Sequence, residues 1–568
     1  MKFINRWQSV LLLFILTGLF AAVSSCKNEE TPAPVTSITS ISPTTAPAGT
    51  TIAITGTNFN STPASNVVTF GTAAATVVSS TPTQLVVTVP AGAGNPITVT
   101  ANGQTATYSG QFTIGNKPVI EVTNEIATSI TWSASNVYLI RGFVYVRSGA
   151  VLTIQPGTVI KGGGPALDPS GGNLGGTLVI QPGARIEAKG TAQQPIVFTS
   201  NAPIGQRKYG DWGGLVLIGR APTNRPAATP FEGGIAGTYG SFNTPNDNSG
   251  TLQYVRIEFP GISLTTSANS EINGLTMYGV GSGTTIDHVQ VSYSGDDSYE
   301  WFGGSVNMKY IVAFRGFDDD FDTDHGYVGR VQFGLSLRDP NAADQSSSNC
   351  FESDNFNPGE NTAAQGAAAP NNGLPLTQPI FANMSGFAFS GTPNTTPTPG
   401  GSGPYQSAMH LRRNTAISIY NSVFSGWPEG LRLDGTATGT LANVTAGALD
   451  LQGIVIANAQ STSVAVRGAG AITNAQAIDF YNTAAKKNVI VASSDVAALL
   501  NAQSFNLTAP AFLPPTGSAL LVAGNAATGG KLTDPFFTAA PYRGAFSGTD
   551  NWLAGWTNFD PQNTNYDR

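Results

Sequence analysis

The chain has 568 residues, which is enough for two or more domains with full cores, and its formal net charge is −7. Only 11% of the residues are charged, against roughly 25% in an average soluble protein, and no basic patch stands out, which argues against nucleic acid as a partner. The 66 Gly and 36 Pro residues predict an all-β fold of short strands and tight turns.

The first residues have the pattern of an export signal. Lys2 and Arg6 form a positive segment, and residues 10–23 form an apolar stretch that is short for a membrane span. Residues 23–26, Val-Ser-Ser-Cys, match the lipobox of bacterial lipoproteins, in which the Cys is acylated and becomes the mature N-terminus. We therefore expect residues 1–25 to be a signal peptide and Cys26 to anchor the protein in the outer membrane. The anchor is stable if Cys26 carries more than one acyl chain.

Residues 26–36 are predicted to be a linker. The segment from Lys27 to Glu30 resembles the surface-export signal of Bacteroidetes lipoproteins, which implies exposure on the cell surface. The Pro-containing residues 31–35 suit a spacer between the lipid and the first domain.

Residues 37–115 are predicted to be a small β-sandwich. Short alternating apolar segments follow one another between turn residues, and no Asp, Glu, Lys, Arg or His occurs from residue 31 to residue 116. The blocks at 41–44, 46–49, 54–59, 68–71, 85–90 and 112–114 resemble the IPT/TIG family of immunoglobulin-like domains in order and spacing. The resemblance implies a spacer or a ligand-binding module. The lack of ionisable side chains argues against acid–base catalysis in this domain.

Short sequence patterns recur along residues 117–568. The segment Leu152-Thr-Ile-Gln-Pro-Gly recurs after 26 residues at Leu178, and the frame that begins at Leu252 recurs at Ile286 and, after 22 more residues, at Met308. Periods in the twenties with very short strands predict a solenoid whose coils share one core. The frame resembles the pectin-lyase-like superfamily and the region resembles β-helix lipoproteins of Bacteroidetes, which implies a right-handed parallel β-helix.

Both open ends of such a stack need a cap. The aromatic-rich segment from Tyr542 to Phe559 is predicted to be the C-terminal cap, with a sugar-stacking platform as the alternative. Residues 220–250 and 339–396 interrupt the coils and are predicted to be long surface loops.

The candidate site is a cluster of acids on two neighbouring coils. A step of 22 residues, the expected length of one coil, places Glu300 beside Asp322 of the next coil. Neighbouring coils of a β-helix lie about 4.8 Å apart. Carboxylates so close repel one another, so that one must gain a proton, a cation or a basic partner. Arg315, Arg330 and Lys309 are basic residues near the cluster in the sequence. The candidate metal ligands are Asp296, Asp297, Glu300, Asp318, Asp319, Asp320, Asp322 and Asp324.

Three interpretations of the cluster stay open: a Ca²⁺ site, a metal-free ladder of paired side chains, and an active site. Trp301, His325 and Arg315 are candidate binding residues beside it. The pectin-lyase-like superfamily includes Ca²⁺-dependent polysaccharide lyases and hydrolases with paired Asp residues. The signature strings of its polygalacturonases are absent here in their usual order, and we assign no catalytic residue.

Two functions are therefore in competition. The first is a non-catalytic surface lipoprotein that binds a polysaccharide, a partner protein or another surface polymer, with Ca²⁺ as a candidate cofactor. The second is a polysaccharide lyase or glycoside hydrolase that uses the acidic cluster at 296–325. The missing enzyme signatures favour the first.

Overall fold

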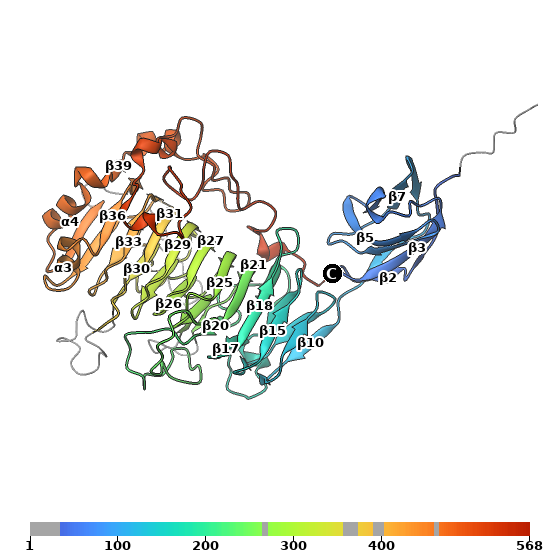
Figure 1. Cartoon of the computed structure of the whole chain (residues 1–568), viewed down its shortest axis with the longest axis horizontal. Helices are drawn as coiled ribbons and strands as arrows, with labels where there is room; N and C mark the ends of the chain where they lie inside the picture. Colours follow the sequence, from blue (N-terminus) through green and yellow to red (C-terminus); the bar gives the residue numbers. More distant parts are fainter. Residues whose placement is uncertain (1–33, 264–270, 356–372, 390–402, 459–464, 568) are drawn as a thin grey trace, which may run out of the picture. The chain divides into compact units, whose positions relative to one another are not determined.

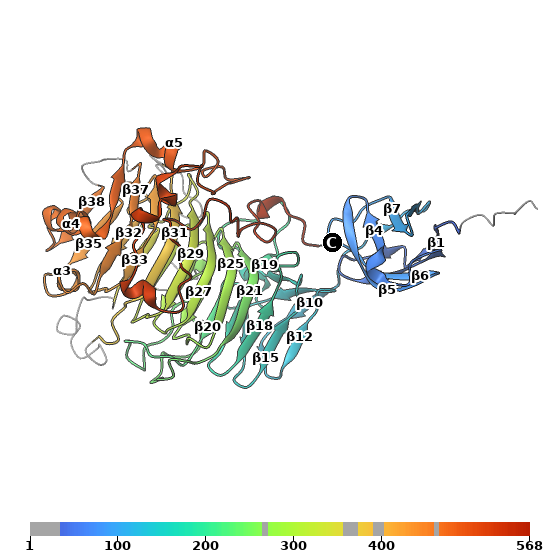
Figure 2. The ribbon, with the colours of Figure 1, turned by 45° about the horizontal axis from the view of Figure 1, so that its top comes forward.

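A computed structural model describes residues 34–263, 271–355, 373–389, 403–458 and 465–567 of the chain (Figures 1 and 2). The predicted signal peptide and Cys26 lie outside these residues. The chain divides into two compact units, Met1–Gly115 and Asn116–Arg568. Among the described residues, no helix has the length and apolar character needed to cross a membrane.

The described part of the first unit is a β-sandwich, as predicted. Its apolar residues alternate with polar ones along each strand, so that one face of each strand is buried, as for Ile52 and Ile54 at no more than 2% exposure. A seven-stranded sheet runs in the order β1 (Ser37–Ser42), β3 (Thr51–Thr57), β6 (Gln84–Thr88), β5 (Ala73–Thr81), β4 (Asn66–Phe70), β7 (Ile97–Ala101) and β8 (Gln104–Thr107). A short parallel pair is formed by β2 (Thr45–Ala46) and β9 (Thr113–Ile114).

The second unit is a parallel β-helix, which confirms the predicted fold. Its coils stack through an 11-stranded and a 17-stranded sheet, with parallel pairing throughout. The 11-stranded sheet consists of β11 (Glu125–Ile126), β14 (Phe143–Val146), β17 (Thr177–Ile180), β20 (Gly214–Ile218), β24 (Leu275–Tyr278), β26 (Tyr299–Phe302), β28 (Phe321–Asp324), β30 (Phe351–Ser353), β32 (Met409–Leu411), β35 (Leu431–Gly435) and β38 (Val466–Gly470).

The 17-stranded sheet forms the other sides of each coil. It consists of β10 (Val119–Val122), β12 (Ile130–Trp132), β13 (Val137–Ile140), β15 (Val151–Ile154), β16 (Val159–Gly162), β18 (Arg185–Lys189), β19 (Ile196–Ser200), β21 (Gly250–Glu258), β25 (Thr285–Ser292), β27 (Asn307–Phe314), β29 (Arg330–Leu337), β31 (Ile380–Phe387), β33 (Ser418–Tyr420), β34 (Val423–Ser425), β36 (Asp450–Gln452), β37 (Val455–Ala457) and β39 (Val489–Val491). A separate antiparallel pair is formed by β22 (Ile262–Ser263) and β23 (Glu271–Ile272).

The long strands in the middle of the stack are bent. β21 pairs with β18 through its first half and with β19 through its second half, so one strand follows two sides of the coil. At the bend, Tyr254, His288 and Tyr310 have φ between 50° and 57°, and each is skipped in the strand pairing. The extra residue explains why the apolar frame of the sequence runs at a spacing of three and then two: Ile286, Val289 and Val291 all point into the core, although a residue in a regular strand would alternate.

The two copies of the Leu-x-Ile-Gln-Pro-Gly segment are not stacked, contrary to the simplest interpretation of the 26-residue repeat. Leu152 lies in β15 of the larger sheet and pairs with Ile186, whereas Leu178 lies in β17 of the smaller sheet and pairs with Val144. The two copies form the same strand–turn–strand structure, but at different corners of the coil. The 22-residue step is a true coil step, because Ile286 pairs with Met308.

Of the two predicted loops, only the first is free of regular strands. Residues 220–249 contain no more than an isolated bridge between Pro230 and Thr238. The stretch 339–396 was predicted to be a loop, yet it includes β30 and β31, which continue the two sheets. The strands were not predicted because their apolar segments are short and lie among many Asn, Pro, Ala and Gly residues.

The end of the stack is covered by a helix rather than by the aromatic segment. Helix α4 (Asn474–Tyr481) begins with a capping box of Thr473 and Gln476, and its Ala477 and Tyr481 belong to the core of the last coils. Two shorter helices, α3 (Thr440–Thr445) and α5 (Val496–Leu499), lie in the same part of the chain.

The predicted aromatic cap instead runs back along the flank of the 17-stranded sheet (Figures 1 and 2). Trp556 contacts the His288 ring edge to face at 5.5 Å, Asn558 exchanges two hydrogen bonds with Gln290, and Tyr566 donates to Glu258. Trp552 and Trp556 are buried here because the rings of His288 and Tyr310 at the bend need a cover, whereas Tyr542 and Phe559 are only partly buried. The two tryptophans are therefore not exposed as a platform for sugar.

Candidate functional site

The outer face of the 11-stranded sheet changes its chemistry along the stack. One side chain per coil points outward at the same position, and the strand register gives the order Val179, Val216, Thr276, Glu300, Asp322, Glu352, His410, Arg432 and Arg467. The apolar start is covered by Phe231, Ile235 and Tyr239 of the loop 220–249. Acids occupy the middle of this ladder and basic side chains its end, whereas the apolar cover of the loop lies on the first positions.

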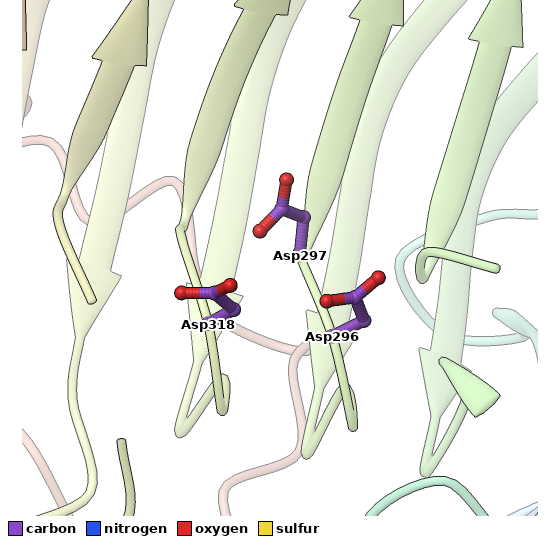
Figure 3. Close-up of side chains that lie close together, drawn as sticks. All are labelled: Asp296, Asp297 and Asp318. Carbon is purple, nitrogen blue, oxygen red and sulfur yellow. The ribbon is translucent and has the colours of Figure 1, made fainter. Parts of the chain in front are cut away.

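The acids gather as the sequence predicted. Glu300 lies opposite Asp322, and the Asp319 backbone N–H donates to Asp297 at 2.8 Å from the neighbouring coil. Two groups of three carboxylates have oxygens that all lie within 4.8 Å of one another: Asp296, Asp297 and Asp318, and also Asp297, Glu300 and Asp322. Figure 3 shows Asp296 and Asp297 on one coil and Asp318 on the next.

Five of the acids lack a basic partner in the part of the chain that the structure describes. Among the residues that the structure describes, no salt bridge reaches Asp296, Asp297, Glu300, Asp318 or Asp322. Asn273 donates to Glu300, but one buried oxygen of Asp322 has no hydrogen-bond partner. Burial, and then the neighbouring carboxylates, raise the pKa of each of the five well above its ordinary value. The arrangement requires protons or a cation.

The other three predicted ligands are already bound within the protein. Asp320 accepts from Ser336 and forms an ion pair of 2.8 Å with Arg338, both side chains being fully buried. Asp324 pairs with His325 at 3.0 Å; burial alone would raise the Asp324 pKa, but the charge and hydrogen bonds of His325 bring it below its ordinary value.

Asp319 is the third of these. It accepts hydrogen bonds from the backbone and side chain of Asn349, yet burial and Glu352 still raise its pKa to about 7. Its oxygens are thus occupied, although its charge adds to the field of the cluster.

The basic residues near the cluster in sequence do not neutralise it. Arg315 pairs with Asp339, Arg330 with Asp534, and Lys309 donates to Thr538. All three side chains bind loops or the C-terminal segment, because they lie on strands of the 17-stranded sheet or directly after one of them.

The actual counter-charges come from later coils. Arg412 contacts both Glu352 and Asp354, and Arg413 pairs with Asp354 at 2.5 Å. Sequence analysis missed these arginines, along with Arg338 and Glu232, because only the coil register brings residues so distant in the chain together. Burial and the nearby Asp324 raise the pKa of Glu232 to about 7.

Two of the three candidate binding residues are buried, and Arg315 is partly exposed. Trp301 lies fully buried in the core, stacked on Tyr327 at 5.4 Å, since the alternation that points Glu300 outward points its neighbour inward. His325 is 2% exposed and bonds Tyr239. Arg315 is held by Asp339. The assignment of these three residues to ligand binding stays a prediction, and the burial of Trp301 and His325 does not favour it.

Residues 124–498 match the family described as pectate-lyase like beta helix domain, and residues 36–114 match the IPT/TIG domain. None of the curated proteins matches the chain. Two solved structures, auxiliary nutrient binding proteins from Bacteroides thetaiotaomicron VPI-5482 and Bacteroides ovatus ATCC 8483, are 26% and 19% identical, with TM-scores of 0.14 and 0.13. Each overlap covers 15% of this chain, which spans only 21% of the length of either structure.

Proposed function

Since the chain belongs to the family of pectate-lyase-like β-helix domains, we propose that it is a non-catalytic lipoprotein that binds a polysaccharide or a comparable polymer at the cell surface. The outer ladder of the 11-stranded sheet supports this proposal. It repeats at about one strand spacing over successive coils, which suits an extended polymer better than a compact ligand.

A cation in the ladder is part of the proposal. Ca²⁺ binds oxygens at 2.3–2.6 Å, so two of its ligand oxygens lie at most about 5 Å apart. The oxygens of Asp297 and its partners lie within 4.8 Å of one another, which is within the reach of a single Ca²⁺ ion. Asp297, which belongs to both groups of three, would be the central ligand.

Unfolding measurements test the cation. Chelator should lower the melting temperature and Ca²⁺ should restore it, with a gain of about 2.7 kcal/mol at a hundredfold excess over the dissociation constant, and Mg²⁺ should do much less. Asp297→Asn should abolish the response. Asp479→Asn, an exposed acid on α4, is the matched control and should keep it. A melting temperature indifferent to chelator in the unmodified protein would reject the cation.

The binding role is tested with a panel of polysaccharides scored for both retention and cleavage, with and without chelator. Retention without shortened products supports the proposal. Shortened products that disappear when Asp297 and Glu300 are neutralised would instead establish a lyase or hydrolase.

The anchor is tested at Cys26. Cys26→Ala should release the protein from outer membranes, because lipid chains on this residue would hold it there. A variant that remains with membranes after a high-salt wash would contradict lipid anchoring. Protease treatment of whole cells then distinguishes exposure on the cell surface from the inner face.

A further inference from the structure

A pocket of about 640 Å³ lies beside the loop 220–249, outside the acidic ladder. Its walls come from both ends of that loop, from the turns after β26 and β28, and from Leu374 and Pro375 before β31. This volume is within the usual range of small-molecule sites, about 300–1,000 Å³.

The walls are fixed by the protein backbone. The Gly304 N–H donates to Pro222 at 3.0 Å, the Val328 N–H donates to Gly304 at 2.9 Å, and the Gly240 N–H donates to Ala227 at 2.9 Å. Asn224 holds the far side by donating to Pro375 at 3.1 Å. A pocket held in this way is formed before a ligand arrives, which reduces the entropic cost of binding.

The lining combines an exposed aromatic side chain, in addition to the buried Tyr239, with polar side chains that form no hydrogen bond among the described residues. Phe242 is 37% exposed, and no other Phe, Tyr or Trp of the described residues is as exposed. The side chains of Thr223, Ser241 and Asn243 line the same pocket and form no hydrogen bond within the described part of the chain. Leu374, 49% exposed, adds a second apolar surface.

The ring of Phe242 is placed by a glycine. Gly240 has φ of +69°, and a Cβ there would lie 2.7 Å from the Phe242 ring. One side of the ring therefore lies close to the backbone of Gly240, and the rest of the side chain contributes to the pocket lining.

We infer that this pocket binds a neutral saccharide, with Phe242 as the stacking surface for a sugar ring. A sugar has an apolar C–H face and a rim of hydroxyls, and these match an aromatic ring beside hydroxyl and amide groups. Among the described lining residues only Arg225 is charged, and its charge also lowers the pKa of Glu232 and Asp324, so the lining offers no cluster of charges for an ionic ligand. The inference rests on the proposed polymer-binding function and locates a sugar site away from the acids.

Calorimetric titration tests the site with neutral gluco-, xylo-, manno- and galacto-oligosaccharides and, separately, with uronate-containing oligosaccharides. Phe242→Ala should weaken binding of a neutral oligosaccharide by about tenfold, and Phe242→Tyr should retain it. The double variant Ser241→Ala/Asn243→Ala should also weaken it. Val522→Ala, at a residue that is 49% exposed and lies outside the pocket, is the control. Unfolding curves check that each variant is folded.

The outcomes separate the two proposals. Binding that Phe242→Ala does not weaken overturns the pocket and leaves polymer binding intact. Binding of uronate-containing oligosaccharides alone overturns the neutral ligand. No binding by the unmodified protein overturns both the pocket and the proposed function. Binding that survives chelator but not Phe242→Ala supports a sugar site independent of the cation.

Discussion

Two outer surfaces of the β-helix carry stacked side chains of opposite character. At the bend of the long strands, the His288 ring stacks on the Tyr310 ring with centroids 4.4 Å apart. On the 11-stranded sheet, Glu300 lies opposite Asp322. Both are ladders of one side chain per coil. Stacked rings attract one another and present an apolar edge, which the C-terminal segment covers with Trp552 and Trp556. Stacked carboxylates repel one another and cannot be closed by apolar packing.

The difference shows that the energetic effect of a residue type accumulates when successive coils place it at the same position. Repetition of an aromatic residue adds stability with every coil, and the covered flank becomes core. Repetition of an acid adds a penalty with every coil, which only a counter-charge relieves. Arg412 supplies it at Glu352, whereas Glu300 and Asp322 stay without one among the described residues. Stability is thus concentrated on one side of the stack and the candidate function on another.

The largest expected effect is the loss of the cover on the aromatic side. Trp556→Ala should destabilise the β-helix by about 3–5 kcal/mol, because Trp556 is 1% exposed and contacts both Tyr254 and His288. Chemical denaturation measures the change, with Ile204→Ala, at a residue 42% exposed, as the control. An effect below that of the control would show that the C-terminal segment is dispensable.

On the acidic side, the paired and unpaired acids should respond differently. Arg338→Met should cost about 3 kcal/mol, since it leaves the fully buried Asp320 carboxylate without its cation. Adding Asp320→Asn should recover much of the loss. If the single variant is as stable as the unmodified protein in denaturation, this ion pair does not contribute to the fold.

Neutralising an unpaired acid should have the opposite sign. Without metal at neutral pH, Asp297→Asn should stabilise the fold by an amount on the order of 2 kcal/mol. The reason is that Asp297 belongs to both groups of three acids, so its replacement removes negative charge from each group. Thermal unfolding in chelator measures this, with Asp479→Asn as the reference. Destabilisation instead would mean that the Asp297 carboxylate is needed where it accepts from Asp319.

The same acids fix the direction of the pH dependence. The folded-state pKa of Asp319 and Glu232 is raised to about 7, so the folded protein binds more protons than the unfolded chain between about pH 4 and 7. Without metal, the unfolding free energy should therefore fall as pH rises through this window, and Ca²⁺ should reduce the fall. A rise over the same window in denaturation curves would contradict the unpaired cluster.

The smallest effect is expected within the aromatic ladder. Tyr310→Leu keeps most of the apolar volume but loses the ring contacts to His288 and Phe333, and should cost about 1 kcal/mol. Tyr310→Phe, which keeps the ring, should be nearly neutral. Equal stability of the two variants would show that burial, not ring stacking, stabilises this flank.

Much of the fold followed from the sequence because its signals are local. The apolar frame at Ile286 and Met308 gave the coil step, and that step gave the pairing of Glu300 with Asp322. The repeat at Leu152 misled, because identical turns serve different corners of a coil. Local patterns also cannot show that Tyr542 to Phe559 returns to strands far back in the chain.

The site was predicted in outline and not in detail for the same reason. A run of acids reveals where negative charge accumulates, but the partners that separate Asp320 and Asp324 from the rest depend on the three-dimensional register. The burial of Trp301 was not apparent from the sequence, because a ring next to an outward-facing acid in a strand points to the opposite side. Phe242 carried no signal in the sequence, since exposure of a single ring depends on the loop around it.

The return of the C-terminal segment has a consequence for how the domain can be cut and rejoined. The backbone N–H of Lys117, just before the first strand, donates to the carbonyl oxygen of Asp567 at 3.1 Å, and the Asp567 side chain pairs with Lys161. In a plain stack of coils the first and last residues are separated by the whole stack; here they are neighbours. A circularly permuted gene that links residue 567 to residue 117 and opens an exposed loop elsewhere should therefore encode the same β-helix.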